Sequence, residues 1–136
     1  MDQRKILQQI EVQRRFFAAG RTLPVESRIE ALRSLRDRLT AMEGEIAEAL
    51  HADLGKSACE SYMCETGLTL AELNHMLRHV RRYASAKRAP TPLAHFSASS
   101  RIMASPYGTA LIMSPWNYPL MLALEPAIDA IAAGNT

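Results

Sequence analysis

Residues 109–119 read Thr-Ala-Leu-Ile-Met-Ser-Pro-Trp-Asn-Tyr-Pro, and this stretch decides the fold. Its first five residues, 109–113, end in a continuous apolar run, which predicts a β-strand buried on both faces of a sheet. A helix is predicted to follow, because Pro119 suits a first helical turn and Gly134 suits the position after the last turn. Pro126 is expected to kink or divide this helix, since proline has no backbone N–H to donate.

A buried strand followed by a helix is the first half of a β-α-β unit. The predicted helix, residues 120–133, is apolar around most of its circumference, so it needs cover on several sides. The sequence reaches Thr136 where the second, parallel strand is expected to begin. We therefore expect an α/β fold whose first β-α unit is incomplete in this chain.

Residues 1–88 are predicted to form a layer of helices. Apolar residues recur there at three- and four-residue steps in four segments, which Gly20, Gly44 and Gly55 separate. The four predicted apolar stripes are Ile6, Ile10, Phe16 and Phe17; Val25, Ile29, Leu32, Leu35 and Leu39; Ile46, Ala49 and Leu50; and Thr66, Leu70, Leu73, Leu77 and Val80. The fourth helix is expected to run from Ser57 or Ser61 to Tyr83 as one element.

Residues 89–113 are predicted to be a connector followed by two strands. Pro90 and Pro92 exclude a helix at its start. The strands are expected at residues 101–105 and 109–113, joined as a hairpin by the turn Pro106-Tyr107-Gly108. Residues 114–136 then form the third part of the chain, after residues 1–88 and 89–113.

Composition and charge exclude several classes of protein. The chain has 136 residues, 48% of them hydrophobic and 22% charged, as in soluble globular domains. A net charge of +2, from 16 basic and 14 acidic residues, gives no reason to expect a nucleic-acid partner. Residues 1–15 lack the apolar core of a signal peptide, and residues 120–133 are too short and too polar for a membrane span. We expect a cytoplasmic protein.

Cysteine and histidine spacing predicts no metal site. Cys59 and Cys64 are five residues apart, which fits neither a CxxC redox pair nor a zinc ligand set, so both are expected to be free thiols. His75 and His79 have the helical spacing of two metal ligands, but no third ligand accompanies them.

Asn117 is the candidate for chemistry, because it follows the predicted buried strand. Ligands of α/β proteins bind beyond the carboxyl ends of strands, and an amide held there can donate a hydrogen bond to a developing oxyanion. The alternative is that Asn117 caps the following helix. Trp116 has the same two interpretations, as a ligand contact or as a buried packing anchor.

Several motifs resemble the aldehyde dehydrogenase superfamily. They are Pro106-Tyr107-Gly108, Ser114-Pro115-Trp116-Asn117-Tyr118-Pro119 and Ala130-Ile131-Ala132-Ala133-Gly134-Asn135. Upstream, Ala49-Leu50-His51-Ala52-Asp53-Leu54-Gly55-Lys56 and the segment from Glu60 to Glu65 are similar to further family motifs. The resemblance runs from about Phe16 onward and is greatest to the class 3 branch, which includes fatty, aromatic and coniferyl aldehyde dehydrogenases.

The resemblance implies NAD(P)-dependent oxidation of an aldehyde to a carboxylic acid. In the family a cysteine thiolate attacks the aldehyde to form a thiohemiacetal, hydride passes to NAD or NADP, and a glutamate activates the water that releases the acid. Asn117 then matches the oxyanion asparagine, while Ser114, Pro115 and Trp116 match a stretch along the adenosine ribose of the cofactor. Tyr118 falls near the substrate tunnel. Residues 114–136 become the start of a Rossmann-like cofactor-binding domain.

The same resemblance implies a longer enzyme. The family's nucleophilic cysteine and catalytic glutamate match nothing in this chain, so residues 1–136 alone are expected to be inactive. The full-length protein is expected to be a homodimer. The alternative is a free-standing helical interaction module without catalysis, against which the apolar circumference of residues 120–133 argues.

Overall fold

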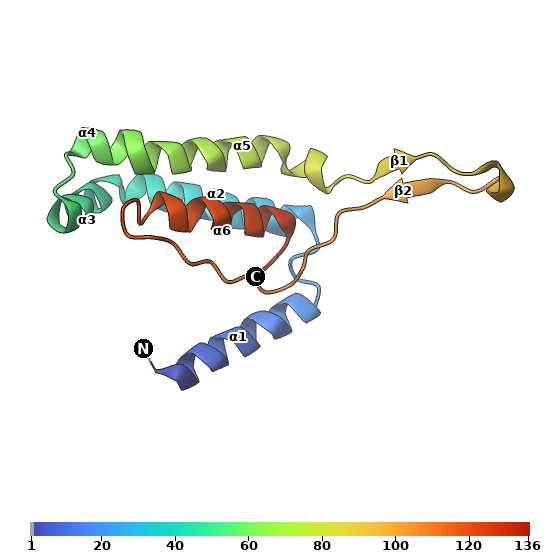
Figure 1. Cartoon of the computed structure of the whole chain (residues 1–136), viewed down its shortest axis with the longest axis horizontal. Coiled ribbons are helices and arrows are strands. Elements are labelled where there is room, and N and C mark those ends of the chain that lie inside the picture. The colour runs from blue at the N-terminus through green and yellow to red at the C-terminus, as the bar shows by residue number, and fades with distance from the viewer. Residues whose placement is uncertain (1) are drawn as a thin grey trace.

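The computed structural model describes residues 2–136 (Figure 1). Its elements are α1 (Gln3–Ala18), α2 (Val25–Ala41), α3 (Glu43–Leu54), α4 (Ala58–Ser61), the π-helix η1 (Tyr62–Thr66), α5 (Gly67–Ala84), β1 (Lys87–Ala89), the 3₁₀-helix η2 (Leu93–His95), β2 (Ser100–Ile102) and α6 (Met121–Ala133). Helices α2, α5 and α6 contact one another, while α1 lies apart from them and the β1–β2 ribbon extends away from the helices (Figure 1). The described chain is therefore mostly helical, with one small antiparallel sheet.

The core lies where α2, α5 and α6 meet. Leu32, Leu73 and Ile128, one from each helix, are fully buried. The other buried members of this cluster are Ile29, Leu39, Val80 and Ala132. The stripes predicted for α2 and α5 are thus confirmed as core faces, whereas no residue of α1 is buried.

Glycines end the helices largely as predicted. Gly55 and Gly134 have φ of +69° and +93° and follow the last residues of α3 and α6, a left-handed conformation that favours glycine. Gly44, by contrast, lies inside the first turn of α3. Of the two outcomes expected at Pro126, a kink or a division, the division does not occur, since α6 runs unbroken from Met121 to Ala133 with Pro126 inside it.

The predicted fourth helix contains a π-turn that the 3.6-residue periodicity did not indicate. Between α4 and α5, residues 62–66 form η1, and the backbone N–H of Gly67 bonds to the carbonyl of Tyr62 five residues earlier. A Cβ atom on Gly67 would lie 2.7 Å from that carbonyl oxygen, so the turn leaves no room for a side chain at this position.

The strands differ from the prediction. β2 overlaps the expected strand at 101–105, but it pairs antiparallel with β1, Arg88 opposite Arg101, and not with residues 109–113. Residues 109–113 form no strand, and Leu111 is 84% exposed. The physical reason is the lack of neighbours, because a strand with two apolar faces is stable only when both of its edges and faces are covered.

One pair of hydrogen bonds nevertheless joins this segment to the end of the chain. The N–H of Thr136 donates to the carbonyl of Gly108 at 2.9 Å, and the N–H of Ala110 donates to the carbonyl of Thr136 at 2.8 Å. In a parallel β-ladder, one residue bonds in this way to two residues of the neighbouring strand that are two positions apart, as Thr136 does to Gly108 and Ala110. Among residues 2–136, this pairing is made by Thr136 with Gly108 and Ala110.

Three further observations concern charge, cysteine and membrane spans. Burial raises the pKa of Glu125 on α6, and the nearby carboxylates of Glu72 and Asp129 raise it further.

Cys59 and Cys64 are free thiols, as predicted. Across the part of the chain that is described, no helix has both the length and the apolar character that crossing a bilayer requires.

Candidate functional site

The predicted site residues lie together in the loop that leads into α6, residues 114–119, which we call the PWN loop. Trp116 is 87% exposed, Asn117 and Tyr118 are exposed, and Ser114 is half-buried. Trp116 and Asn117 therefore face outward from the helical layer, whereas Tyr118 is only 36% exposed. The loop itself is attached to that layer through its main chain, as the following contacts show.

A buried ion pair lies beneath the PWN loop. Lys56 Nζ is 2.5 Å from Glu65 Oε1, and the two side chains are only 9% and 0% exposed. Lys56 is placed by the turn between α3 and α4, where Gly55 ends one helix and the Ser57 hydroxyl caps the next by accepting the N–H of Glu60. Charges buried this deeply must be compensated by partners, because removing them from water is costly.

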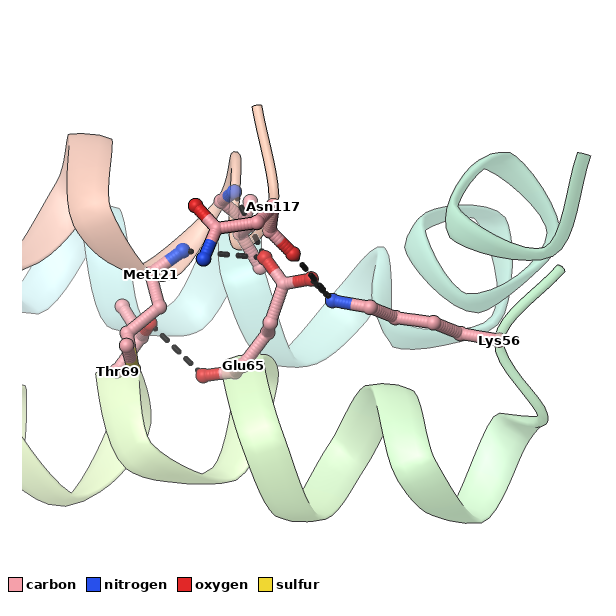
Figure 2. Close-up of polar contacts among 6 residues, drawn as sticks. Lys56, Glu65, Thr69, Asn117 and Met121 are labelled. Atoms are coloured by element: carbon pink, nitrogen blue, oxygen red, sulfur yellow. Dashed lines mark hydrogen bonds and ion pairs between the residues drawn. The ribbon is translucent and has the colours of Figure 1, made fainter. Parts of the chain in front are cut away.

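Glu65 caps α6 from another part of the chain. Its Oε2 accepts the backbone N–H groups of Leu120 at 2.8 Å and Met121 at 3.3 Å (Figure 2). The first N–H groups of a helix have no partner within the helix, and a carboxylate there also interacts favourably with the helix dipole. The hydroxyl of Thr69 donates to the main-chain carbonyl of Glu65 at 2.9 Å and secures the residue on its own helix.

Lys56 holds the middle of the PWN loop. Its ammonium donates to the main-chain carbonyl of Asn117 at 3.0 Å (Figure 2) and lies 4.2 Å from the centre of the Tyr118 ring. Such a cation over an aromatic face is an attractive contact. One ion pair thus binds main-chain atoms on both sides of Tyr118 and Pro119.

These contacts bear on the alternatives that the sequence left open for Asn117 and Trp116. Asn117 does not cap α6, because that helix has no side-chain cap from its own N-cap residue and its first N–H groups are bonded to Glu65. Within residues 2–136 the side-chain amide of Asn117 has no hydrogen-bond partner, and its donor is free to meet a ligand. Within residues 2–136 Trp116 is 87% exposed and so anchors no packing there.

The histidine pair forms an aromatic stack. The rings of His75 and His79 are 4.3 Å apart, and His75 Nε2 lies 3.0 Å from the hydroxyl of Tyr83. Among the described residues, no three histidine, cysteine or carboxylate side chains gather in a way that could hold a metal ion.

Comparison with known proteins identifies the family. The model of the "Aldehyde dehydrogenase family" matches residues 1–136. The chain belongs to this family. It is 41% identical over 121 residues to the 4,4'-diaponeurosporen-aldehyde dehydrogenase of Staphylococcus aureus, which covers 89% of the chain and 26% of that protein. It is also 41% identical over 122 residues to human aldehyde dehydrogenase family 3 member B1, with 90% and 26% coverage.

A solved structure agrees with these relatives. The substrate-bound state of Staphylococcus aureus AldH superimposes with a TM-score of 0.93 at 40% identity, covering 96% of this chain and 29% of that one. Family 3 members among the relatives confirm the class 3 resemblance. The chain spans about a quarter of the length of the curated relatives it matches. A free-standing interaction module is therefore not favoured.

Sequence reasoning missed Lys56 and Glu65 as parts of the site. Both belong to segments that resembled family motifs, but neither was given a function. A signal was present for Glu65, since it precedes the buried Thr69 and Leu73 by four and eight residues and so lies on the buried face of the helix. A carboxylate on such a face must have a partner, and that partner had to come from elsewhere in the chain.

Proposed function

We propose that this chain supplies the amino-terminal part of an enzyme that oxidises an aldehyde to a carboxylic acid with NAD or NADP, and that Asn117 is its oxyanion donor. The observation that carries the proposal is the state of Asn117. Its side-chain amide is exposed and has no partner within residues 2–136, while its main-chain carbonyl is bonded to the buried Lys56. An unpaired donor on a fixed main chain is what oxyanion stabilisation requires.

In the proposed reaction, a cysteine thiolate from outside residues 1–136 adds to the aldehyde carbon. The carbonyl π electrons move to oxygen as the S–C bond forms, giving a thiohemiacetal oxyanion. The amide of Asn117 donates a hydrogen bond to this oxygen and lowers the barrier. Loss of hydride from the same carbon re-forms the carbonyl and leaves a thioester. Water, activated by a glutamate that also lies outside residues 1–136, hydrolyses this thioester, which releases the carboxylic acid and restores the thiolate.

NAD or NADP, when bound, accepts the hydride that leaves the substrate carbon. Ser114, Pro115 and Trp116 would lie along the adenosine ribose. They fit that role, because among residues 2–136 their backbone groups make no hydrogen bonds and are free for a ligand's hydroxyl groups, and the Trp116 ring is exposed. Tyr118 would lie near the tunnel that admits the aldehyde, with its ring against the ammonium of Lys56.

The full-length enzyme is proposed to be a homodimer in the cytoplasm. Support for the dimer comes from the β1–β2 ribbon, which extends from the helical layer (Figure 1) and carries exposed apolar side chains. Leu93 and Phe96 at its tip are 91% and 89% exposed, and Ile102 on β2 is 65% exposed. Exposed apolar side chains along a projecting element are typical of an interface. The two free thiols agree with a reducing compartment.

The test of the proposed function is Asn117→Ala in the full-length enzyme. We expect kcat to fall by about 10²–10³-fold, the usual effect of removing one oxyanion donor. The thermal midpoint and the Kd for NAD(P) should change little, because the side-chain amide makes no hydrogen bond within the described chain. Asn74→Ala, on the exposed surface of α5, is the matched control and should leave kcat unchanged. Wild-type turnover in Asn117→Ala would refute the proposal.

A further inference from the structure

We propose that the buried pair Lys56–Glu65 is a positioning device that sets the catalytic geometry of Asn117. This inference rests on the proposed function, because it assigns the pair a role in the reaction through the oxyanion donor. Neither side chain would touch substrate or cofactor, since both are buried beneath the PWN loop. They are positioning residues.

The first step of the argument is how the two carboxylate oxygens of Glu65 divide their partners. Oε1 is bonded to the Lys56 ammonium, and Oε2 accepts the N–H groups of Leu120 and Met121. The ammonium in turn holds the carbonyl of Asn117. The carboxylate therefore fixes the start of α6 directly and fixes Asn117 through Lys56. As a result, both ends of the segment from Asn117 to Leu120 are bonded to the Lys56–Glu65 pair.

The second step concerns what else holds Asn117. Pro119 restricts the backbone inside this segment, because its ring fixes φ. On the other side, residues 111–116 make no main-chain hydrogen bonds within residues 2–136, and Met113 and Trp116 are 85% and 87% exposed. The next residue, Tyr118, is also held, because the N–H of Leu122 donates to its carbonyl at 3.1 Å. Within the described chain, the bond from Lys56 is the one hydrogen bond that Asn117 itself makes, so the position of its amide depends on that bond.

The third step is why a charged pair suits this role. Hydrogen bonds with one ionised partner are shorter and stronger than neutral ones, and exclusion of water strengthens them further. An oxyanion donor must lie about 2.7–3.1 Å from the developing charge, and a displacement of about 1 Å can lower a rate by 10²-fold. Loosening Asn117 therefore removes a contact made in the transition state while substrate binding persists, so kcat falls and KM does not rise.

The experiment measures kcat and KM of the full-length enzyme with a double-mutant cycle between Lys56 and Asn117. Lys56→Met removes the ammonium and keeps an unbranched side chain. We expect it to lower kcat by about 10–10²-fold with KM unchanged within about twofold. Arg81→Met is the matched control, because it removes the cation of the exposed Arg81–Glu26 pair, and it should leave kcat unchanged.

The cycle separates positioning from general damage to the fold. In the Asn117→Ala background, Lys56→Met should lower kcat by less than about twofold, because a residue that acts through Asn117 has nothing left to position. Equal losses in both backgrounds would overturn the positioning role while the proposed function stands. Unchanged kcat in Asn117→Ala itself would refute the proposed function first, so the two failures are distinguishable.

A second variant keeps the test decisive if Lys56→Met does not fold. Lys56→Met combined with Glu65→Gln leaves no unpaired buried charge, and the glutamine oxygen can still accept the N–H groups of Leu120 and Met121. This double variant should fold, as judged by circular dichroism, and should still show the loss of kcat. A folded double variant with wild-type kcat overturns the inference.

Discussion

Replacing Gly67 by alanine should destabilise the protein, although this substitution stabilises most helices. Alanine is favoured over glycine inside a helix by about 1 kcal/mol, and the backbone of Gly67 is helical, with φ of −65° and ψ of −39°. Conformation alone therefore predicts a gain in stability. The π-turn reverses that expectation because of where the carbonyl of Tyr62 lies.

The magnitude follows from the space at this position. An alanine Cβ would lie 2.7 Å from the Tyr62 carbonyl oxygen, about 0.7 Å short of the 3.4 Å at which ordinary contact begins. That oxygen cannot simply move away, since it accepts the N–H of Gly67. Overpacking of this kind costs about 1–3 kcal/mol. Set against the propensity gain of about 1 kcal/mol, the cost leaves a net loss of about 1 kcal/mol.

Gly44→Ala is the matched control. Gly44 lies in the first turn of α3, and a Cβ there would meet no atom within 4 Å. It should stabilise the protein by about 0.5–1 kcal/mol. Urea unfolding of the full-length protein, followed by circular dichroism, should move the two midpoints in opposite directions. A midpoint for Gly67→Ala at or above the wild-type value would refute the argument from the π-turn.

Three further outcomes are expected. Leu73→Ala should lower the free energy of unfolding by about 2–5 kcal/mol in urea titrations, whereas Leu68→Ala, on the same helix but 45% exposed, should cost less than about 1 kcal/mol. The pKa of Glu125 is raised in the folded state, so its ionisation costs stability as pH rises above the usual value of 4.5; Glu125→Gln should raise the thermal midpoint at neutral pH and lose this advantage below that value. Residues 1–136 expressed alone should form no NAD(P)H from aldehyde, and any saturable turnover would contradict the assignment of the nucleophile to another part of the enzyme.

Local pattern was sufficient for much of the fold. The stripes of α2 and α5 were predicted because their core faces repeat at helical spacing, and Leu32 and Leu73 are fully buried as expected. Gly55 and Gly134 were recognised as helix ends because the left-handed conformation after a helix favours glycine. These features depend on neighbouring residues alone, which is why one sequence reveals them.

Two kinds of feature were not predicted: contacts between distant segments, and the insertion of one extra residue into a helical turn. A π-turn adds one residue to a single turn, too small a change for periodicity to register across the helix that contains Gly67. The pair Lys56–Glu65 and its bonds to the PWN loop join segments more than 50 residues apart. For residues 109–113 the pattern indicated a buried strand, but burial needs neighbours that residues 2–136 provide only at Thr136.

The way in which the PWN loop is held bears on how its chemistry can be changed. The ion pair holds the loop through the carbonyl of Asn117 and holds the start of α6 through the N–H groups of Leu120 and Met121, and almost every amino acid possesses these groups. The attachment therefore does not depend on which side chains the loop carries. Replacing Trp116 would remove none of these bonds, and replacing Tyr118 would remove only a contact between its ring and Lys56. Libraries that vary these two positions would diversify what the loop presents to ligands while leaving the backbone that carries Asn117 in place.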